Sequence, residues 1–177
     1  MKSGKIQIIK IEGFHSPYTT PPVPDLEEID GHDLPKSKQK WIRPILPDDD
    51  DVDKMSDKEK SELIYREFIR RLRGYWFMNN GEPTYITGDY YFYLTYWFIG
   101  AITKDGYPEY RKANRDWMYV VDFCEKDRNC MGLIAMCQKR DGKTERHLST
   151  LYNRATLIDE NCLFGMQSLN ATEAKNN

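Results

Sequence analysis

MGLIAMCQKRDGKT, at residues 131–144, is the stretch of sequence that determines which fold we predict. Residues 131–137 form a continuous apolar run, which is typical of a strand buried on both faces of a parallel sheet. Residues 138–142 are polar and turn-forming, residues 143–157 have the pattern of a helix, and Cys162–Met166 suggests a second strand. The sequence therefore predicts one strand-helix-strand unit in this part of the chain.

The turn between the predicted strand and helix fits the phosphate-loop pattern in its last three residues, Gly142, Lys143 and Thr144, and has Cys137 where that pattern begins with glycine. A glycine allows the backbone to turn closely around an oxygen-rich ligand, and the first amides of the following helix point toward a phosphate. The lysine ammonium can bridge the β and γ phosphates, and the threonine hydroxyl can bind magnesium. A Gly-Lys-Thr tripeptide is common by chance, but its place between a buried-strand pattern and a helix favours nucleotide binding over a surface turn.

We therefore predict that this loop binds ATP and Mg²⁺. Lys143 and Arg140 are assigned to catalysis, and Thr144 is assigned to the metal. The positive charge of Lys139 and Arg140 either helps to neutralise phosphates, which we favour, or is simply solvated. The predicted nucleotide-contacting residues of the loop are Gln138, Lys139, Arg140, Asp141, Gly142, Lys143, Thr144 and Glu145.

The chain upstream of this loop divides into two further regions. Residues 1–55 hold most of the nine prolines and an acidic run at 48–53, which predicts an extended arm or linker with a short strand between Ile6 and Ile11. The acidic run is interpreted as a solvated linker, because adjacent residues on a flexible segment cannot preorganise ligands around a metal ion. Residues 56–107 are predicted to form a helical subdomain, and residues 108–177 the beginning of an ATPase core.

Three helices are predicted before the apolar run. The first starts with a capping box, in which Ser56 and Glu59 satisfy each other's backbone amides, and ends near Asn79-Asn80-Gly81. The second spans Tyr90 to Ala101 and is mostly buried, and the third begins after Tyr107-Pro108. The predicted buried stripes are Leu63, Ile64, Phe68 and Leu72 in the first helix and Ala113, Trp117, Val120, Val121 and Cys124 in the third.

At this point the chain resembles a known family. An apolar strand followed by an arginine-containing loop that ends in Gly-Lys-Thr is similar to the variant Walker A loop of tailed-phage large terminase subunits, several of which also lack the first glycine. The stretch GYWFMNNGEPTYITG at residues 74–88 resembles the N-terminal region of terminases from phages of Bacteroidetes-type hosts, including crAss-like phages. The resemblance covers roughly residues 60 to 168.

The resemblance implies an α/β P-loop NTPase fold of the ASCE, RecA-like kind, with an extended N-terminal arm, a helical N-terminal subdomain and an incomplete core. It implies the N-terminal ATP-binding part of a viral DNA-packaging motor, a hydrolase that acts in the host cytoplasm. The implied partners are double-stranded viral DNA, the portal protein and the small terminase subunit, with a ring oligomer for the full-length protein and no membrane.

The family also carries an adenine-recognition pair on a helix ahead of the P-loop strand, and Tyr110 and Arg111 occupy the matching place here. Arg111 replaces the usual glutamine, and Tyr110 can equally be a capping or core aromatic residue. Packaging motors also require a strand that ends in Asp-Glu and a nuclease domain. Asp159-Glu160 follows the P-loop helix too closely to end that strand, so we interpret it as a helix end. Hydrolysis is therefore expected to need residues outside this chain. We expect the chain to be a fragment or a truncated gene product.

Two other classes of function remain open at this stage. One is another P-loop protein, such as a helicase or a small nucleotide kinase. The other is a non-catalytic protein- or nucleic-acid-interaction module, in which the arginines between Arg66 and Arg73, beside Tyr75 and Trp76, form a binding surface. A formal net charge of -2, from 26 basic and 28 acidic residues, excludes the strong basic excess of a stand-alone nucleic-acid binder.

Overall fold

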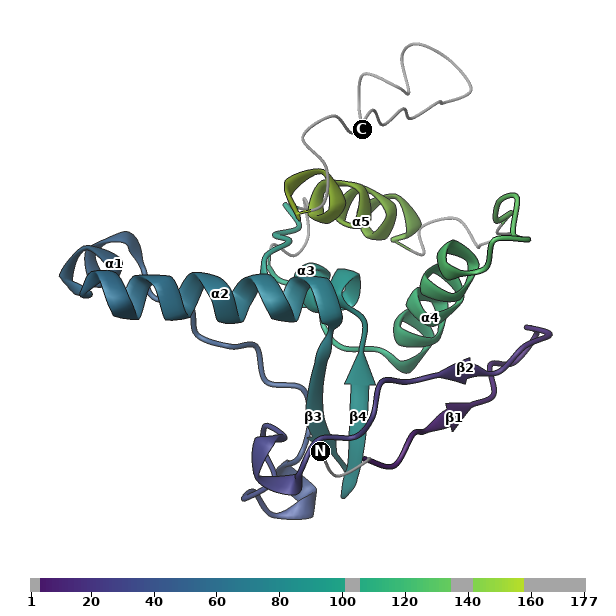
Figure 1. The fold of residues 1–177 in the computed structure, drawn as a ribbon, viewed down its shortest axis with the longest axis horizontal. Coiled ribbons are helices and arrows are strands. Elements are labelled where there is room, and N and C mark those ends of the chain that lie inside the picture. The colour runs from purple at the N-terminus through teal and green to yellow at the C-terminus, as the bar shows by residue number, and fades with distance from the viewer. Residues whose placement is uncertain (1–3, 101–105, 135–141, 158–177) are drawn as a thin grey trace, which may run out of the picture.

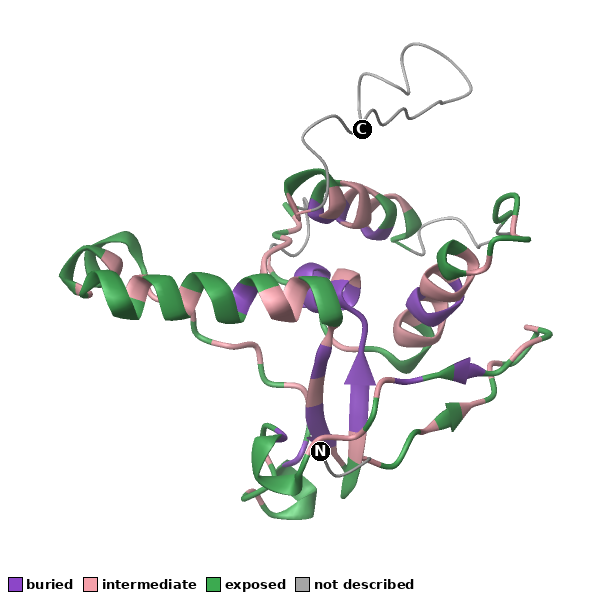
Figure 2. Ribbon diagram, in the orientation of Figure 1, coloured by how far each residue is buried: buried purple, intermediate pink, exposed green. Residues whose placement is uncertain are grey.

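The computed structural model describes residues 4–100, 106–134 and 142–157. Within these residues the chain is a mixed α/β structure with five α-helices and two antiparallel two-stranded sheets. In Figure 1 the β3–β4 hairpin stands below the short helix α3, α4 and α5 lie beside α3, and α2 projects away from the body. The buried residues concentrate where α3 meets the hairpin and the neighbouring helices (Figure 2).

The long helix α2 (Asp57–Arg73) begins as the sequence predicts. The Ser56 hydroxyl accepts a hydrogen bond from the Glu59 amide at 3.4 Å, and the Glu59 carboxylate accepts one from the Ser56 amide at 2.8 Å, so the capping box is confirmed. The short helix α1 (Asp49–Lys54) precedes it, and the Asp48 side chain caps α1 by accepting from the Asp51 amide. Part of the acidic run predicted as linker is therefore helical.

A β-hairpin replaces the predicted end of the first helix. The helix stops at Gly74, and β3 (Tyr75–Asn79) pairs antiparallel with β4 (Glu82–Ile86). The turn residues Asn80 and Gly81 both have positive φ angles, 52° and 89°, as a tight two-residue hairpin turn requires. The prediction that the helix reaches Asn79 is therefore wrong. The aromatic and β-branched residues on either side of Asn-Gly are the sequence pattern that indicates a hairpin.

Helix α3 (Gly88–Thr95) is the centre of the core. Thr87 caps it by accepting from the Tyr90 amide, and all its residues except Asp89 are buried. The predicted buried helix is thus present but ends six residues before Ala101, because Trp97 to Gly100 form an irregular segment that pairs Ile99 with Gly106.

Helix α4 (Lys112–Lys126) is present, but its most buried residues are Met118, Tyr119 and Val120 rather than the whole predicted stripe. Ala113 is exposed. The helix packs against two partners at once, since Met118 faces α5 and Tyr119 stacks on Tyr18 of the N-terminal arm at 4.2 Å between ring centroids. A single amphipathic stripe cannot describe a helix that is covered on two sides.

The N-terminal arm lies along the body and is anchored at several points. The strand predicted between Ile6 and Ile11 is present as β1 (Ile8–Ile9), which pairs with β2 (Tyr18–Thr19). The Tyr18 hydroxyl donates to the Asp122 carboxylate at 2.7 Å, and the Trp41 ring contacts the Tyr75 and Phe77 rings edge-on. Two 3₁₀ turns, η1 (Leu26–Glu28) and η2 (Lys36–Lys38), connect these anchors.

The predicted strand at residues 131–137 is wrong in the part that the structure describes. Residues 131–134 have no regular secondary structure, and Met131 and Ile134 are 98% and 95% exposed. A buried parallel strand needs neighbouring strands on its edges, and the described residues contain no parallel sheet that could supply them. Residues 135–137 and the predicted strand Cys162–Met166 lie outside the described residues. The P-loop architecture therefore remains a hypothesis, whereas the mixed α/β class is confirmed.

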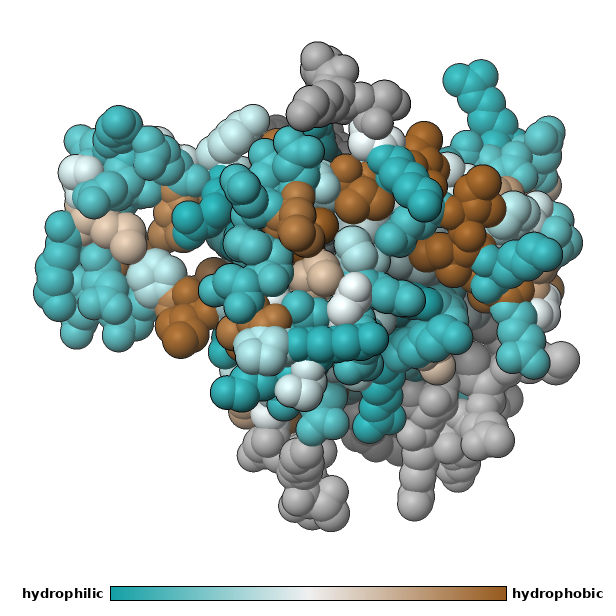
Figure 3. All heavy atoms as spheres, turned by 90° about the horizontal axis from the view of Figure 1, so that it is seen from below, coloured by the Kyte–Doolittle hydropathy of each residue, from teal (hydrophilic) through white to brown (hydrophobic). Residues whose placement is uncertain are grey.

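The surface of the protein is mixed in polarity. Hydrophobic side chains open to solvent lie among hydrophilic ones on the face shown in Figure 3. Among the described residues, no helix combines the length and apolar character that a membrane crossing requires.

Candidate nucleotide-binding site

The described part of the predicted phosphate loop lies at the start of helix α5 (Lys143–Leu157), whose predicted bounds are confirmed. Gly142 has a φ of 68°, in the left-handed region that glycine adopts without strain. The first backbone hydrogen bond of the helix runs from the Arg146 amide to the Gly142 carbonyl at 3.2 Å. The amides of Lys143, Thr144 and Glu145 consequently have no acceptor within the helix, and they give this end a partial positive charge.

The side chains at this corner are accessible. Gly142 and Lys143 are exposed, and Thr144 is half-buried. Lys143 forms no ion pair with any residue that the structure describes. An ammonium, a hydroxyl and several backbone amides are thus available together to an anionic ligand.

Glu145, by contrast, already has a partner within the protein. The Trp97 indole N–H donates to its carboxylate at 2.7 Å. This bond connects the first turn of α5 to the segment that follows α3. Glu145 therefore helps to position the helix start, and its predicted contact with nucleotide stays a prediction.

Two cations, Arg146 and Lys143, lie close to His147 in the first turns of α5. Burial lowers the pKa of His147, and the nearby charges of Arg146 and Lys143 lower it further. The His147 ring stacks on Trp117 of α4 at 5.7 Å between centroids. These positive charges favour the neutral form of the imidazole, and Glu145 is the acidic residue of the same helical turn.

Helix α5 is held in place by polar side chains that the sequence analysis did not identify. Arg146, Ser149 and Asn153 are all buried on its inner face. Arg146 donates to the Asn114 side chain of α4, and the Asn153 amide donates to the Asp89 carboxylate of α3 at 2.8 Å. The face of α5 that a purely apolar pattern would bury is thus partly polar.

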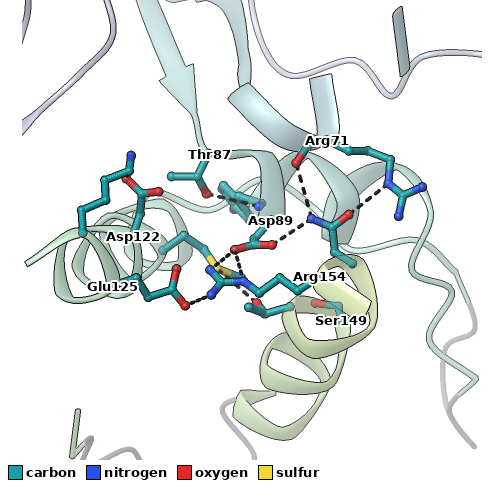
Figure 4. Close-up of polar contacts among 12 residues, drawn as sticks. Arg71, Thr87, Asp89, Asp122, Glu125, Ser149 and Arg154 are labelled. Atoms are coloured by element: carbon teal, nitrogen blue, oxygen red, sulfur yellow. Dashed lines mark hydrogen bonds and ion pairs between the residues drawn. The ribbon is translucent and has the colours of Figure 1, made fainter. Parts of the chain in front are cut away.

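Asp89 is the centre of this network (Figure 4). Its carboxylate accepts two hydrogen bonds from the Arg154 guanidinium, at 2.6 and 3.1 Å, in addition to the bond from Asn153. Glu125 of α4 forms an ion pair with the same guanidinium, and Asn153 also accepts from Arg71 of α2 at 3.0 Å. Four helices therefore meet at one charged cluster, and the cluster fixes the orientation of α5.

Tyr110 and Arg111 lie immediately before α4. The Tyr110 ring contacts Phe77 and Tyr90 at 5.3 and 5.9 Å between centroids. Arg111 donates its backbone N–H to the Tyr90 hydroxyl at 2.8 Å and accepts from that hydroxyl through its carbonyl. These contacts describe a core and capping role for the pair, and contact with an adenine base stays a prediction.

Gln138, Lys139, Arg140 and Asp141 lie outside the described residues, as does Asp159-Glu160. The described candidate site therefore consists of residues 142–145 with the elements that hold them. An aromatic hollow of about 520 Å³, with Phe92, Trp97 and Tyr152 among its walls, lies on the flank of α5. Trp97 lines this hollow and also donates to Glu145, so it connects the hollow to the first turn of α5.

Comparison of the chain with known family models, with curated proteins and with solved structures gave no match. The resemblance to large terminase subunits thus rests on the residues quoted above.

Proposed function

We propose that this chain binds Mg-ATP at the start of α5 and is the N-terminal ATP-binding part of a viral DNA-packaging motor of the large-terminase type. One observation carries the first half: a left-handed glycine, an exposed lysine and a threonine occur in the order Gly-Lys-Thr at one helix end, where the first backbone amides have no acceptor within the helix. The second half rests on the sequence resemblance alone.

The described residues fit a triphosphate and its metal. The amides of Lys143 to Glu145 can donate to phosphate oxygens, and the Lys143 ammonium supplies a mobile positive charge. The Thr144 hydroxyl is an oxygen ligand of the kind that magnesium accepts. Bound Mg-ATP would supply a phosphoanhydride bond for hydrolysis, and this chain's residues would bind and orient it.

The anchoring of α5 supports the same proposal. A phosphate-binding helix end has to keep its amides aimed at one place, and the Asp89 cluster fixes α5 from three sides. In a packaging motor the partners would be double-stranded viral DNA, the portal protein and the small terminase subunit, in the host cytoplasm, and a full-length protein would assemble as a ring.

A calorimetric titration of the chain with ATP tests this proposal. We expect binding in magnesium, weaker binding when a chelator removes the metal, and loss of that metal dependence in Thr144→Val, which keeps the shape but not the hydroxyl. Thr144→Ser retains the hydroxyl and is the matched control, so its metal dependence should match that of the unmodified chain. Absence of ATP binding by the unmodified chain, or an unchanged magnesium effect in Thr144→Val, would show that the assignment is wrong.

A further inference from the structure

Helix α2 exposes large apolar side chains to solvent and buries a charged one. Its only buried residue is Glu67, whose carboxylate accepts from the Tyr91 and Tyr96 hydroxyls at 2.6 and 2.9 Å and pairs with Arg70. The sequence predicts that Leu63, Ile64, Phe68 and Leu72 are buried, and this prediction is wrong for the last three. The exposed fractions on this stripe are 69% for Ile64, 39% for Phe68 and 44% for Leu72, and the adjacent Tyr65 is 68% exposed.

These exposed residues form one continuous face. Ile64, Phe68 and Leu72 are spaced four residues apart, so they lie in a row along one side of the helix, and Tyr65 flanks them. The helix projects from the body with most of its length uncovered (Figures 1 and 2). Its 17 residues give it a length of about 25 Å, enough for a second helix to pack along it. An apolar face of this kind on a projecting helix marks an interaction surface.

The charges on α2 indicate which partner fits. Its last two turns carry a net positive charge, from Arg66, Arg70, Arg71 and Arg73 with Glu67 among them. Its first turns and the preceding α1 carry a net negative charge, because their seven acidic residues outnumber three lysines, Lys54, Lys58 and Lys60. A second α2 laid antiparallel on the first would bring each acidic end to a basic end, whereas a parallel arrangement would place like charges together.

We propose that the apolar face of α2 binds α2 of a second copy of this chain, in an antiparallel, two-fold symmetric pair. With the symmetry axis at Phe68, Ile64 of each copy faces Leu72 of the other, and the two Phe68 rings meet at the centre. Glu62, near the acidic end, then lies next to Arg73 of the second copy. The interface is isologous, so it closes at two copies and differs from the head-to-tail contact that builds a ring. It does not depend on nucleotide binding.

Sedimentation equilibrium on the full chain, from roughly 1 to 100 µM, tests the pairing, because a single helix pair is a small interface and gives weak association. We expect a monomer-dimer equilibrium with a dissociation constant in that range. Phe68→Asp should raise the constant by more than about tenfold, since it places two like charges at the centre of a buried face. Leu26→Asp, which changes an exposed leucine in η1, is the matched control and should leave the constant unchanged.

Charge reversal tests the antiparallel orientation. Glu62→Arg and Arg73→Glu should each weaken self-association, because each homodimer then brings like charges together at both ends of the pair. An equimolar mixture of the two variants should regain dimers, since the mixed pair has two arginines on one copy facing two glutamates on the other, and both contacts are restored. A chain that stays monomeric throughout the concentration range, or a mixture that associates no better than the separate variants, would overturn the proposal.

Discussion

Replacing Lys143 with alanine is expected to weaken Mg-ATP binding by about 10- to 100-fold. A hydrogen bond or ion pair from an ammonium to a phosphate contributes roughly 1.5 to 3 kcal/mol, and about 1.4 kcal/mol corresponds to a factor of ten in the dissociation constant. Lys143 is exposed and forms no ion pair with the described residues, so its removal takes little from the folded protein. Calorimetric titration of both proteins with ATP in magnesium measures the difference.

The control for this variant is Lys58→Ala, which removes an exposed lysine of α2 that pairs with Glu62 across one helical turn. It should bind Mg-ATP as the unmodified chain does. Thermal unfolding of Lys143→Ala should match that of the unmodified chain within about 0.5 kcal/mol, the usual effect of a surface substitution. Equal weakening by both lysine variants would mean that the ammonium acts through overall charge and not at the start of α5.

Replacing Asp89 with alanine is expected to lower the free energy of unfolding by about 3 kcal/mol. The substitution leaves the mostly buried Arg154 guanidinium with Glu125 as its carboxylate partner among the described residues. It also removes the nearer of two acceptors of the Asn153 amide, which keeps only the Arg71 carbonyl at 3.4 Å. Breaking a buried ion pair by removing one partner typically costs roughly 3 to 5 kcal/mol, and the remaining Glu125 contact places the expected value at the lower end. Urea denaturation, followed by tyrosine and tryptophan fluorescence, gives the free energy.

Asp57→Ala is the matched comparison for Asp89→Ala, because both residues are acids in the first turn of a helix, α2 and α3 respectively. Asp57 is exposed, so its loss should cost only the few tenths of a kcal/mol that a charge contributes at a helix end. If the two variants lose the same small amount of stability, the Asp89 cluster does not hold α5 against the body.

Local signals in the sequence were enough to predict several elements. The capping box of Ser56 and Glu59 located the start of α2, and Gly142 followed by a polar helical pattern located the start of α5. Both signals act within one turn, through hydrogen bonds and backbone conformations that adjacent residues determine. The conformation at the start of α5 consists of such local features, so it could be predicted, whereas nucleotide contact by Gly142, Lys143 and Thr144 stays a prediction.

Long-range packing accounts for what the sequence analysis missed. An apolar stripe shows that a helix has an apolar face, but not whether the rest of the chain covers that face. In α2 the face stays open, since Ile64 and Phe68 are exposed. An apolar run such as residues 131–134 likewise requires neighbouring strands before it can be buried. The contacts of Asp89 with Asn153 and Arg154 join residues more than sixty positions apart, and no local pattern encodes them.

Nuclear magnetic resonance of the ¹⁵N-labelled chain, titrated with Mg-ATP, tests the central claim most directly. If a polyphosphate binds at the start of α5, the largest shifts will occur at the backbone amides of Gly142, Lys143 and Thr144, and inorganic tripolyphosphate will shift the same amides. Unchanged amides at these three residues under saturating Mg-ATP, or shifts centred on another part of the described chain, would contradict the account.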